Sequence, residues 1–192
     1  SIWGGEDYDE YQNPEIRLWN RDSSNDEWKK ELDGNATTLA ISANGEYIVA
    51  GCDDDKVYLF DKDSSTPLWD YTVEGGMYWW GGWNQKTVSI SADGEYIVVG
   101  SNNGKIHLFD IDSNTPIWIH DIYEDECGDE ISYCQIKSVD ISANGEYIVA
   151  GSYTHEEGND KIYLFNRDSS TPLWSYGTAN EDHLYLFDKD SS

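Results

Sequence analysis

The chain has 192 residues, and its 38 Asp and Glu residues against 12 Lys and Arg residues give a net charge of −26 at pH 7. This charge argues against nucleic-acid partners and anionic membrane surfaces, because both are bound through Lys and Arg. Aromatic residues make up 14% of the chain, too many for a disordered acidic segment, so we expect a packed protein with an acidic, solubilising surface. No apolar run approaches the roughly 18 residues of a membrane-spanning helix, and no signal peptide is visible.

The chain repeats itself. The phrase Ile-Ser-Ala-Asn-Gly-Glu-Tyr-Ile-Val-Ala-Gly begins at residues 41, 90 and 141, and the second copy differs only at Asp93 and Val99. A second phrase that ends in Thr-Pro-x-Trp follows each copy and begins at residues 59, 108 and 164. Self-similarity at a period of about 40–50 residues indicates a repeat architecture.

We divide this single region into an incomplete first unit, three full units and a remnant. Residues 1–31 align with the third full unit without a gap but lack its first strand. The full units cover residues 36–74, 86–122 and 137–176. Residues 181–192 repeat only the third strand and the turn that follows it.

Each full unit contains four short segments rich in Ile, Val, Tyr, Phe and Trp, which predict strands, and no segment has a sustained helical period. We expect first strands at 38–43, 87–92 and 138–143, second strands at 47–51, 96–100 and 147–151, third strands at 56–61, 105–110 and 161–166, and fourth strands at 67–71, 116–120 and 172–176.

The links between these strands predict antiparallel neighbours. Asn-Gly or Asp-Gly joins the first strand to the second, and both dipeptides accept the positive φ angles of a tight hairpin. An Asp- and Ser-rich turn that ends in Pro leads to the fourth strand. The third strand is apolar on both faces, since Val57 and Leu59 alternate with Tyr58 and Phe60. Four-stranded sheets stacked around an axis cover both faces, so the predicted fold is an all-β propeller.

The repeats resemble two known propeller families. Residues 90–101, Ile-Ser-Ala-Asp-Gly-Glu-Tyr-Ile-Val-Val-Gly-Ser, look like a WD40 hairpin, and residues 16–20, Ile-Arg-Leu-Trp-Asn, resemble its third strand. Residues 60–69 are similar to the quinoprotein-like (PQQ-like) repeat, in which a Trp after an Asp turn docks between blades. The WD40 Gly-His dipeptide is absent from every repeat. The resemblance therefore implies blade docking by Trp28, Trp69, Trp118 and Trp174. The composition and style of the repeats are also similar to propeller repeats of secreted archaeal surface proteins.

The ends of the chain do not close a ring in the pattern. Trp174 is only 13 residues before Phe187, whereas a full hairpin separates the corresponding residues of earlier units. We expect a partial propeller or part of a larger ring. The alternative is that residues 183–190 supply the missing strand of the first unit and close a four-bladed ring.

Variation between the units is confined to one edge of the predicted ring. Successive turns alternate between the two edges, and the links from second to third strand and from blade to blade differ in length and content. We expect any binding function at this edge. Its candidate residues are Tyr78, Trp79, Trp80 and Trp83, whose aromatic rings suit a sugar or protein partner unless they pack on a neighbouring blade, and Glu124, Asp125 and Glu126.

Metal binding is not expected. The acidic clusters at residues 53–55 and 124–130 supply oxygen ligands for Ca²⁺, but a solvated surface explains them better. The Asp-x-Asp-x-Ser spacing at residues 61–65 lacks the Gly and Glu of a calcium loop and reads as a structural turn.

Two further features suit an extracellular or cell-surface protein. Cys127 and Cys134 lie close together in one acidic segment, where either a disulfide or two free thiols fits the sequence. Asn35 begins the only glycosylation sequon, Asn-Ala-Thr.

No histidine is paired with a Ser or Cys nucleophile in a recognisable motif, so we expect no enzyme and no cofactor. The predicted function is a non-catalytic extracellular or surface propeller that binds a protein or glycan partner or joins a larger assembly. A carbohydrate-binding propeller is the alternative, and a fragment of a pyrroloquinoline quinone dehydrogenase is a more distant one.

Overall fold

The computed structural model describes residues 14–19, 22, 25–73, 87–122, 134–154 and 160–177. These residues form four antiparallel sheets and no helix. The first sheet pairs β1 (Glu15–Trp19) with β2 (Asp26–Glu31). The other sheets have four strands each, paired in the chain order of a simple meander.

The second sheet contains β3 (Ala36–Ile41), β4 (Tyr47–Cys52), β5 (Lys56–Asp61) and β6 (Trp69–Thr72). The third sheet contains β7 (Val88–Ile90), β8 (Tyr96–Gly100), β9 (Lys105–Asp110) and β10 (Trp118–Asp121). The fourth sheet contains β11 (Cys134–Ile141), β12 (Tyr147–Thr154), β13 (Lys161–Asn166) and β14 (Trp174–Gly177).

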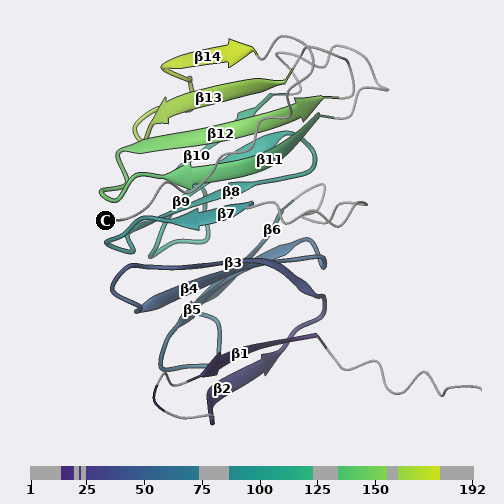
Figure 1. Ribbon diagram of the computed structural model, residues 1–192, viewed down its shortest axis with the longest axis vertical. Helices are drawn as coiled ribbons and strands as arrows, with labels where there is room; N and C mark the ends of the chain where they lie inside the picture. Colours follow the sequence, from purple (N-terminus) through teal and green to yellow (C-terminus); the bar gives the residue numbers. More distant parts are fainter. Residues whose placement is uncertain are drawn as a thin grey trace, which may run out of the picture.

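The sheets stack face to face in chain order along the long axis of the molecule (Figure 1). Among the first strands, β7 contacts both β3 and β11, which makes these three the inner strands of the stack. Backbone bonds link their ends: the Ala43 N–H donates to the Ala92 carbonyl at 3.2 Å, and the Ala92 N–H to the Ala143 carbonyl at 3.0 Å. The sheets are therefore radial wedges of an open arc.

The strand boundaries differ from expectation mainly at the first and fourth strands. Each fourth strand begins at its Trp, two residues after the predicted Pro, because the Ser and Thr before that Pro still belong to the turn. β3 and β11 begin earlier than predicted, and a bulge near the start of each strand shifts the register. All three third strands match the predicted bounds.

The hairpin between first and second strands has a different turn from the one predicted. Among the described residues of these turns, only Gly45, Gly94 and Gly145 have positive φ angles, at 73°, 81° and 67°. The N–H of Gly45 donates to the Ser42 carbonyl, which closes a four-residue turn. The Asn44 side chain accepts a bond from the Glu46 N–H rather than adopting a left-handed backbone.

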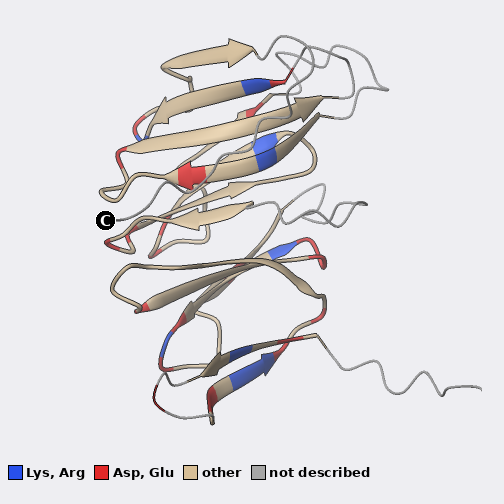
Figure 2. Cartoon of the chain, in the orientation of Figure 1, with Lys and Arg blue, Asp and Glu red and all other residues tan. Residues whose placement is uncertain are grey.

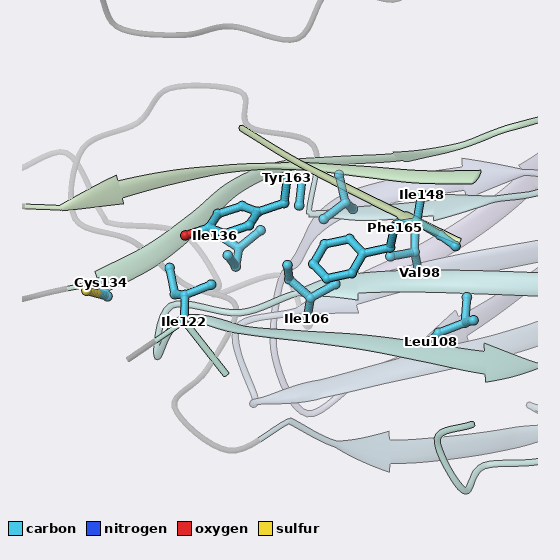
Figure 3. Close-up of a cluster of buried hydrophobic side chains, with 11 residues drawn as sticks. Val98, Ile106, Leu108, Ile122, Cys134, Ile136, Ile148, Tyr163 and Phe165 are labelled. Carbon is cyan, nitrogen blue, oxygen red and sulfur yellow. The ribbon is translucent and has the colours of Figure 1, made fainter. Parts of the chain in front are cut away.

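The hydrophobic core lies between the sheets. One cluster fills the space between the first and second sheets, another between the second and third, and another between the third and fourth. Figure 3 shows the last of these, where Phe165 and Tyr163 meet Ile106 and Ile122. Each middle sheet is thus apolar on both faces, as the alternation in its third strand predicts.

Charged residues are rare on these faces, and one of them, Asp140 of β11, accepts a bond from the Ser89 hydroxyl of β7 at 2.7 Å. Asp and Glu lie mainly in turns and at strand ends, while most strand centres are uncharged (Figure 2). No helix that could span a bilayer occurs in the part of the chain that the structure describes.

Candidate functional site

The stack has two edges with different contents. At the "turn edge", the turn between first and second strands meets the turn between third and fourth: the Lys62 N–H donates to the Glu46 carbonyl, and Ile111 repeats the bond to Glu95. At the "loop edge", the loops between second and third strands meet the blade connections, as in the bond from the Val73 N–H to the Asp55 carbonyl. The backbone therefore confirms the prediction that successive turns alternate between the two edges.

The turn edge is built the same way in each full sheet. The first acidic or amide side chain of the Asp-x-Asp motif accepts the N–H two residues later, at 2.8 Å for Asp61 and 3.0 Å for Asp110. The Ser that follows accepts the Thr N–H at 3.0 Å. The spacing that faintly matches a calcium loop thus serves the backbone of a turn.

Tryptophans at this edge join neighbouring sheets. The Trp28 ring lies 5.5 Å from the Phe60 ring, and its indole N–H donates to the Lys62 carbonyl at 2.7 Å. Trp69 and Trp118 do the same with the next sheets, with ring distances of 5.6 and 5.4 Å to Phe109 and Phe165 and indole bonds to the Ile111 and Arg167 carbonyls. We call each such set a blade joint.

A tyrosine completes two of the joints. Tyr47 lies against the turn glycine Gly94 of the next sheet, and Tyr96 lies against Gly145. A Cβ atom at Gly145 would stand 2.3 Å from the Tyr96 ring, so this glycine is required for close approach as well as for its backbone angle. The guanidinium of Arg167 covers the same Tyr96 ring at 4.5 Å.

The loop edge carries the predicted sequon and the Asp53–Asp55 cluster. Asn35 is exposed, and its side-chain nitrogen donates to Asp53 at 2.9 Å. Asp54 accepts bonds from the Lys56 N–H and the Tyr58 hydroxyl, at 3.0 and 2.6 Å. Asp54 therefore orders its own loop, and Asp53 joins that loop to the preceding blade connection. Within the described residues, no group of three or more His, Cys, Asp or Glu side chains is placed to hold a metal ion.

Cys52 is a buried free thiol beneath this loop. Burial, with the nearby Asp54 and Asp53 carboxylates, raises the pKa of the thiol to about 12. Ser101, at the same position of the next repeat, accepts the Lys105 N–H, whereas Asp54 performs this task in the Cys52 loop. Cys52 therefore packs in the core at the position that Ser101 and Ser152 occupy in the later repeats.

Lys137 is a loop-edge residue that the sequence reasoning missed. It lies at the bulge of β11, and its ammonium group is 5.2 Å from the centre of the Tyr153 ring. Burial lowers the pKa of Lys137 to about 8, although Asp160 acts in the opposite direction. Lys86 holds the same position in the preceding repeat. In a chain with few cations, this recurrence is the sequence signal that could have singled out Lys137.

The family described as outer membrane protein assembly factor BamB matches residues 11–190. The chain belongs to this PQQ-like repeat family. No curated protein matches the sequence.

Two solved structures show the same fold. BamB from Moraxella catarrhalis is 15% identical with a TM-score of 0.61, and the match covers 85% of this chain and 42% of that one. Hydrazine synthase from Kuenenia stuttgartiensis is 16% identical with a TM-score of 0.60, covering 81% of this chain and 40% of the other. The predicted all-β propeller is confirmed. The described blades form a partial ring, and the chain spans about two fifths of these relatives.

Several predicted site residues of this propeller lie outside the described residues. They are Tyr78, Trp79, Trp80, Trp83, Glu124, Asp125, Glu126 and Cys127. Cys134 is disulfide-bonded, while Cys52 is free. Trp174, the last predicted docking residue, is 48% exposed at the outer face of the fourth sheet.

Proposed function

We propose that this propeller segment is a non-catalytic module that binds a protein partner through its loop edge, outside the cell or at its surface. The observation that carries the proposal is that the two edges differ: the turn edge is built alike in each full sheet, and the loop edge is not. Residues that recur in the repeats are occupied in turns and blade joints, while the loop edge differs from sheet to sheet. A repeated scaffold whose sequence varies at one edge only is typical of a binding module.

The family supports a role in assembly and a location near the cell surface. Its description names an outer membrane protein assembly factor, and assembly factors act by contacting other proteins. The sequon at Asn35 and the bonded Cys134 suit an oxidising, extracytoplasmic compartment. The net charge of −26 favours a partner with a basic surface.

The two arginines among the described residues are engaged within the blades and are not available to a quinone cofactor. Arg17 forms ion pairs with Glu15 and Asp26, the latter at 3.4 Å. Arg167 covers the Tyr96 ring. Both guanidinium groups therefore serve the blades instead of a quinone carboxylate, which favours a non-catalytic role.

Site-directed photocrosslinking in the native organism tests the proposal. A photoreactive residue at Asn102, on the loop edge of the third sheet, is expected to capture the same protein partner repeatedly. The matched control is the same residue at Asn114, on the turn edge of that sheet. Equal capture from both positions, or capture from Asn114 alone, would contradict a loop-edge binding function.

A sugar-binding role is the second candidate, because the connection that carries Trp79 and Trp80 begins at Val73, whose N–H is bonded within the loop edge. Aromatic rings next to glycines suit stacking on pyranose faces. Glycan-array binding that is lost in Trp79→Ala and Trp80→Ala variants would support it. An intact protein that binds no glycan would remove it.

A further inference from the structure

The outer face of the fourth sheet is apolar and, among the described residues, uncovered. Val149, Ile162 and Leu164 are only half-buried there, whereas their equivalents Val98, Ile106 and Leu108 are fully buried in the third sheet. Trp174 is 48%, Tyr176 67% and Tyr147 43% exposed. We call these six residues, Tyr147, Val149, Ile162, Leu164, Trp174 and Tyr176, the fourth-sheet face.

This face holds one half of a blade joint. In the three joints described above, a Trp on one sheet meets a Phe on the third strand of the next, and its indole N–H donates to the carbonyl two residues after that Phe. Trp174 stands at the same position of its sheet as Trp69 and Trp118, paired across from Leu164. A matching strand therefore needs a Phe and a carbonyl at this spacing.

The sequence at the end of the chain has a Phe and a following residue at this spacing. Residues 184–192 read Leu-Tyr-Leu-Phe-Asp-Lys-Asp-Ser-Ser, and residues 57–65 read the same except for Val at the first position. The earlier copy is the segment that receives Trp28, through Phe60 and the Lys62 carbonyl. Phe187 and Lys189 occupy the corresponding positions of the later copy.

We propose that residues 183–188 dock on the fourth-sheet face as the third strand of a further blade, with Phe187 against Trp174 and the Lys189 carbonyl accepting the indole N–H. Tyr185 would stand beside Tyr176, as Tyr163 stands beside His120 at the preceding joint.

The connecting segment is long enough. β14 ends at Gly177, paired with Lys161, which is the first residue of its third strand. His183 aligns with that same first position, so both ends of the connection belong at the loop edge. Six residue steps reach roughly 20 Å when extended. Stacked sheets lie about 10 Å apart and neighbouring strands about 5 Å, so the required span is shorter.

A second copy of the chain is the competing occupant. Its first sheet would present Trp19, 57% exposed, at the position of Phe60. Arg17, however, stands where Tyr58 stands, and it is held by Glu15 and Asp26. A charged strand covers an apolar face poorly, and two chains of −26 repel one another, so the chain's own segment fits better.

Photocrosslinking of the full chain tests the inference. Phe187→p-benzoylphenylalanine is expected to crosslink to the peptide that contains β13 and β14. The crosslinked product is expected to have the mass of one chain. The matched control is Leu186→p-benzoylphenylalanine, because the adjacent side chain of a strand points to the opposite face. A crosslinked dimer, no crosslink to β13–β14, or equal crosslinking from 186 would overturn the proposal.

A second readout avoids the unnatural residue. Hydroxyl-radical labelling of Trp174 is expected to rise in Phe187→Ala, because the ring that covers the indole is removed. Asp190→Asn, in the same terminal segment, is expected to leave the labelling unchanged. Unchanged labelling of Trp174 in Phe187→Ala would also overturn the docking. Neither readout depends on a loop-edge partner, so the proposed function can fail independently.

Discussion

The turn glycines perform two separable tasks at the residue scale. All three hold positive φ angles, but only Gly94 and Gly145 also receive a tyrosine from the preceding sheet. A Cβ at Gly45 would meet nothing within 4 Å. The same substitution at Gly45 and at Gly145 therefore separates backbone strain from inter-blade contact.

Gly45→Ala is expected to destabilise the protein by about 1 kcal/mol, the cost of a left-handed L-residue. Gly145→Ala is expected to cost a further 1–3 kcal/mol or so, because its Cβ meets the Tyr96 ring and the ring must shift. Urea unfolding of both variants measures the difference. Equal losses at the two sites would show that the Tyr96 contact contributes nothing.

The buried thiol of Cys52 gives a pH-dependent prediction. Its pKa is about 12 in the folded chain, against 9.0 for the reference thiol. Between these values the unfolded thiol has lost its proton and the folded one has kept it, so rising pH favours unfolding. Stability should fall from pH 9 to 12 more steeply in the wild type than in Cys52→Ser.

Thermal unfolding across this pH range measures the effect, and alkylation supplies the control. Native Cys52 should resist iodoacetamide at pH 8.5 and react once the chain is unfolded in urea, because thiolate is the reactive form. Parallel pH profiles for the wild type and Cys52→Ser would contradict the assignment of the raised pKa to this residue.

Blade joints are the units of stability at the element scale. Each joint combines ring packing with one indole bond to a carbonyl, so the bond can be removed while most of the packing remains. Trp69→Phe is expected to cost about 1–2 kcal/mol, since the Ile111 carbonyl loses its partner. Trp118→Phe should behave alike through Arg167.

Trp19→Phe is the matched control, because Trp19 is 57% exposed on β1. Its effect on the free energy of unfolding is expected to stay within about 0.5 kcal/mol, as for most surface changes. A loss at Trp19 as large as the loss at Trp69 would show that the indole bonds do not carry the joints.

Sequence alone could predict the elements well and their joints only in part. The repeat period, the apolar alternation in the third strands and the position of each Trp can be read from residue types. The sheets and the docking tryptophans could therefore be predicted from the sequence. The turn type was not, because Asn44 can either adopt a left-handed backbone or accept the Glu46 N–H, and only tertiary contacts decide. Lys137 escaped notice because its low pKa arises from burial at a bulge.

The acidic surface acts at the scale of the whole molecule. A net charge of −26 on 192 residues repels itself in the compact state more than in the expanded chain. Because the described Asp and Glu residues lie mainly at turns and strand ends, their repulsion passes through solvent and is open to screening by salt (Figure 2). A simple electrolyte should therefore stabilise the fold.

We expect the melting temperature to rise steadily as NaCl increases from about 10 mM to 1 M, while the screening length falls from roughly 30 to 3 Å. CaCl₂ at equal ionic strength provides the comparison that separates screening from binding. A melting temperature that rises further with CaCl₂ would indicate calcium binding in addition to screening. Among the residues that the structure describes, no group of three or more His, Cys, Asp or Glu side chains is placed to hold a metal ion. A melting temperature that does not respond to NaCl would mean that blade packing outweighs the surface charge, and that the acid serves the binding of partners.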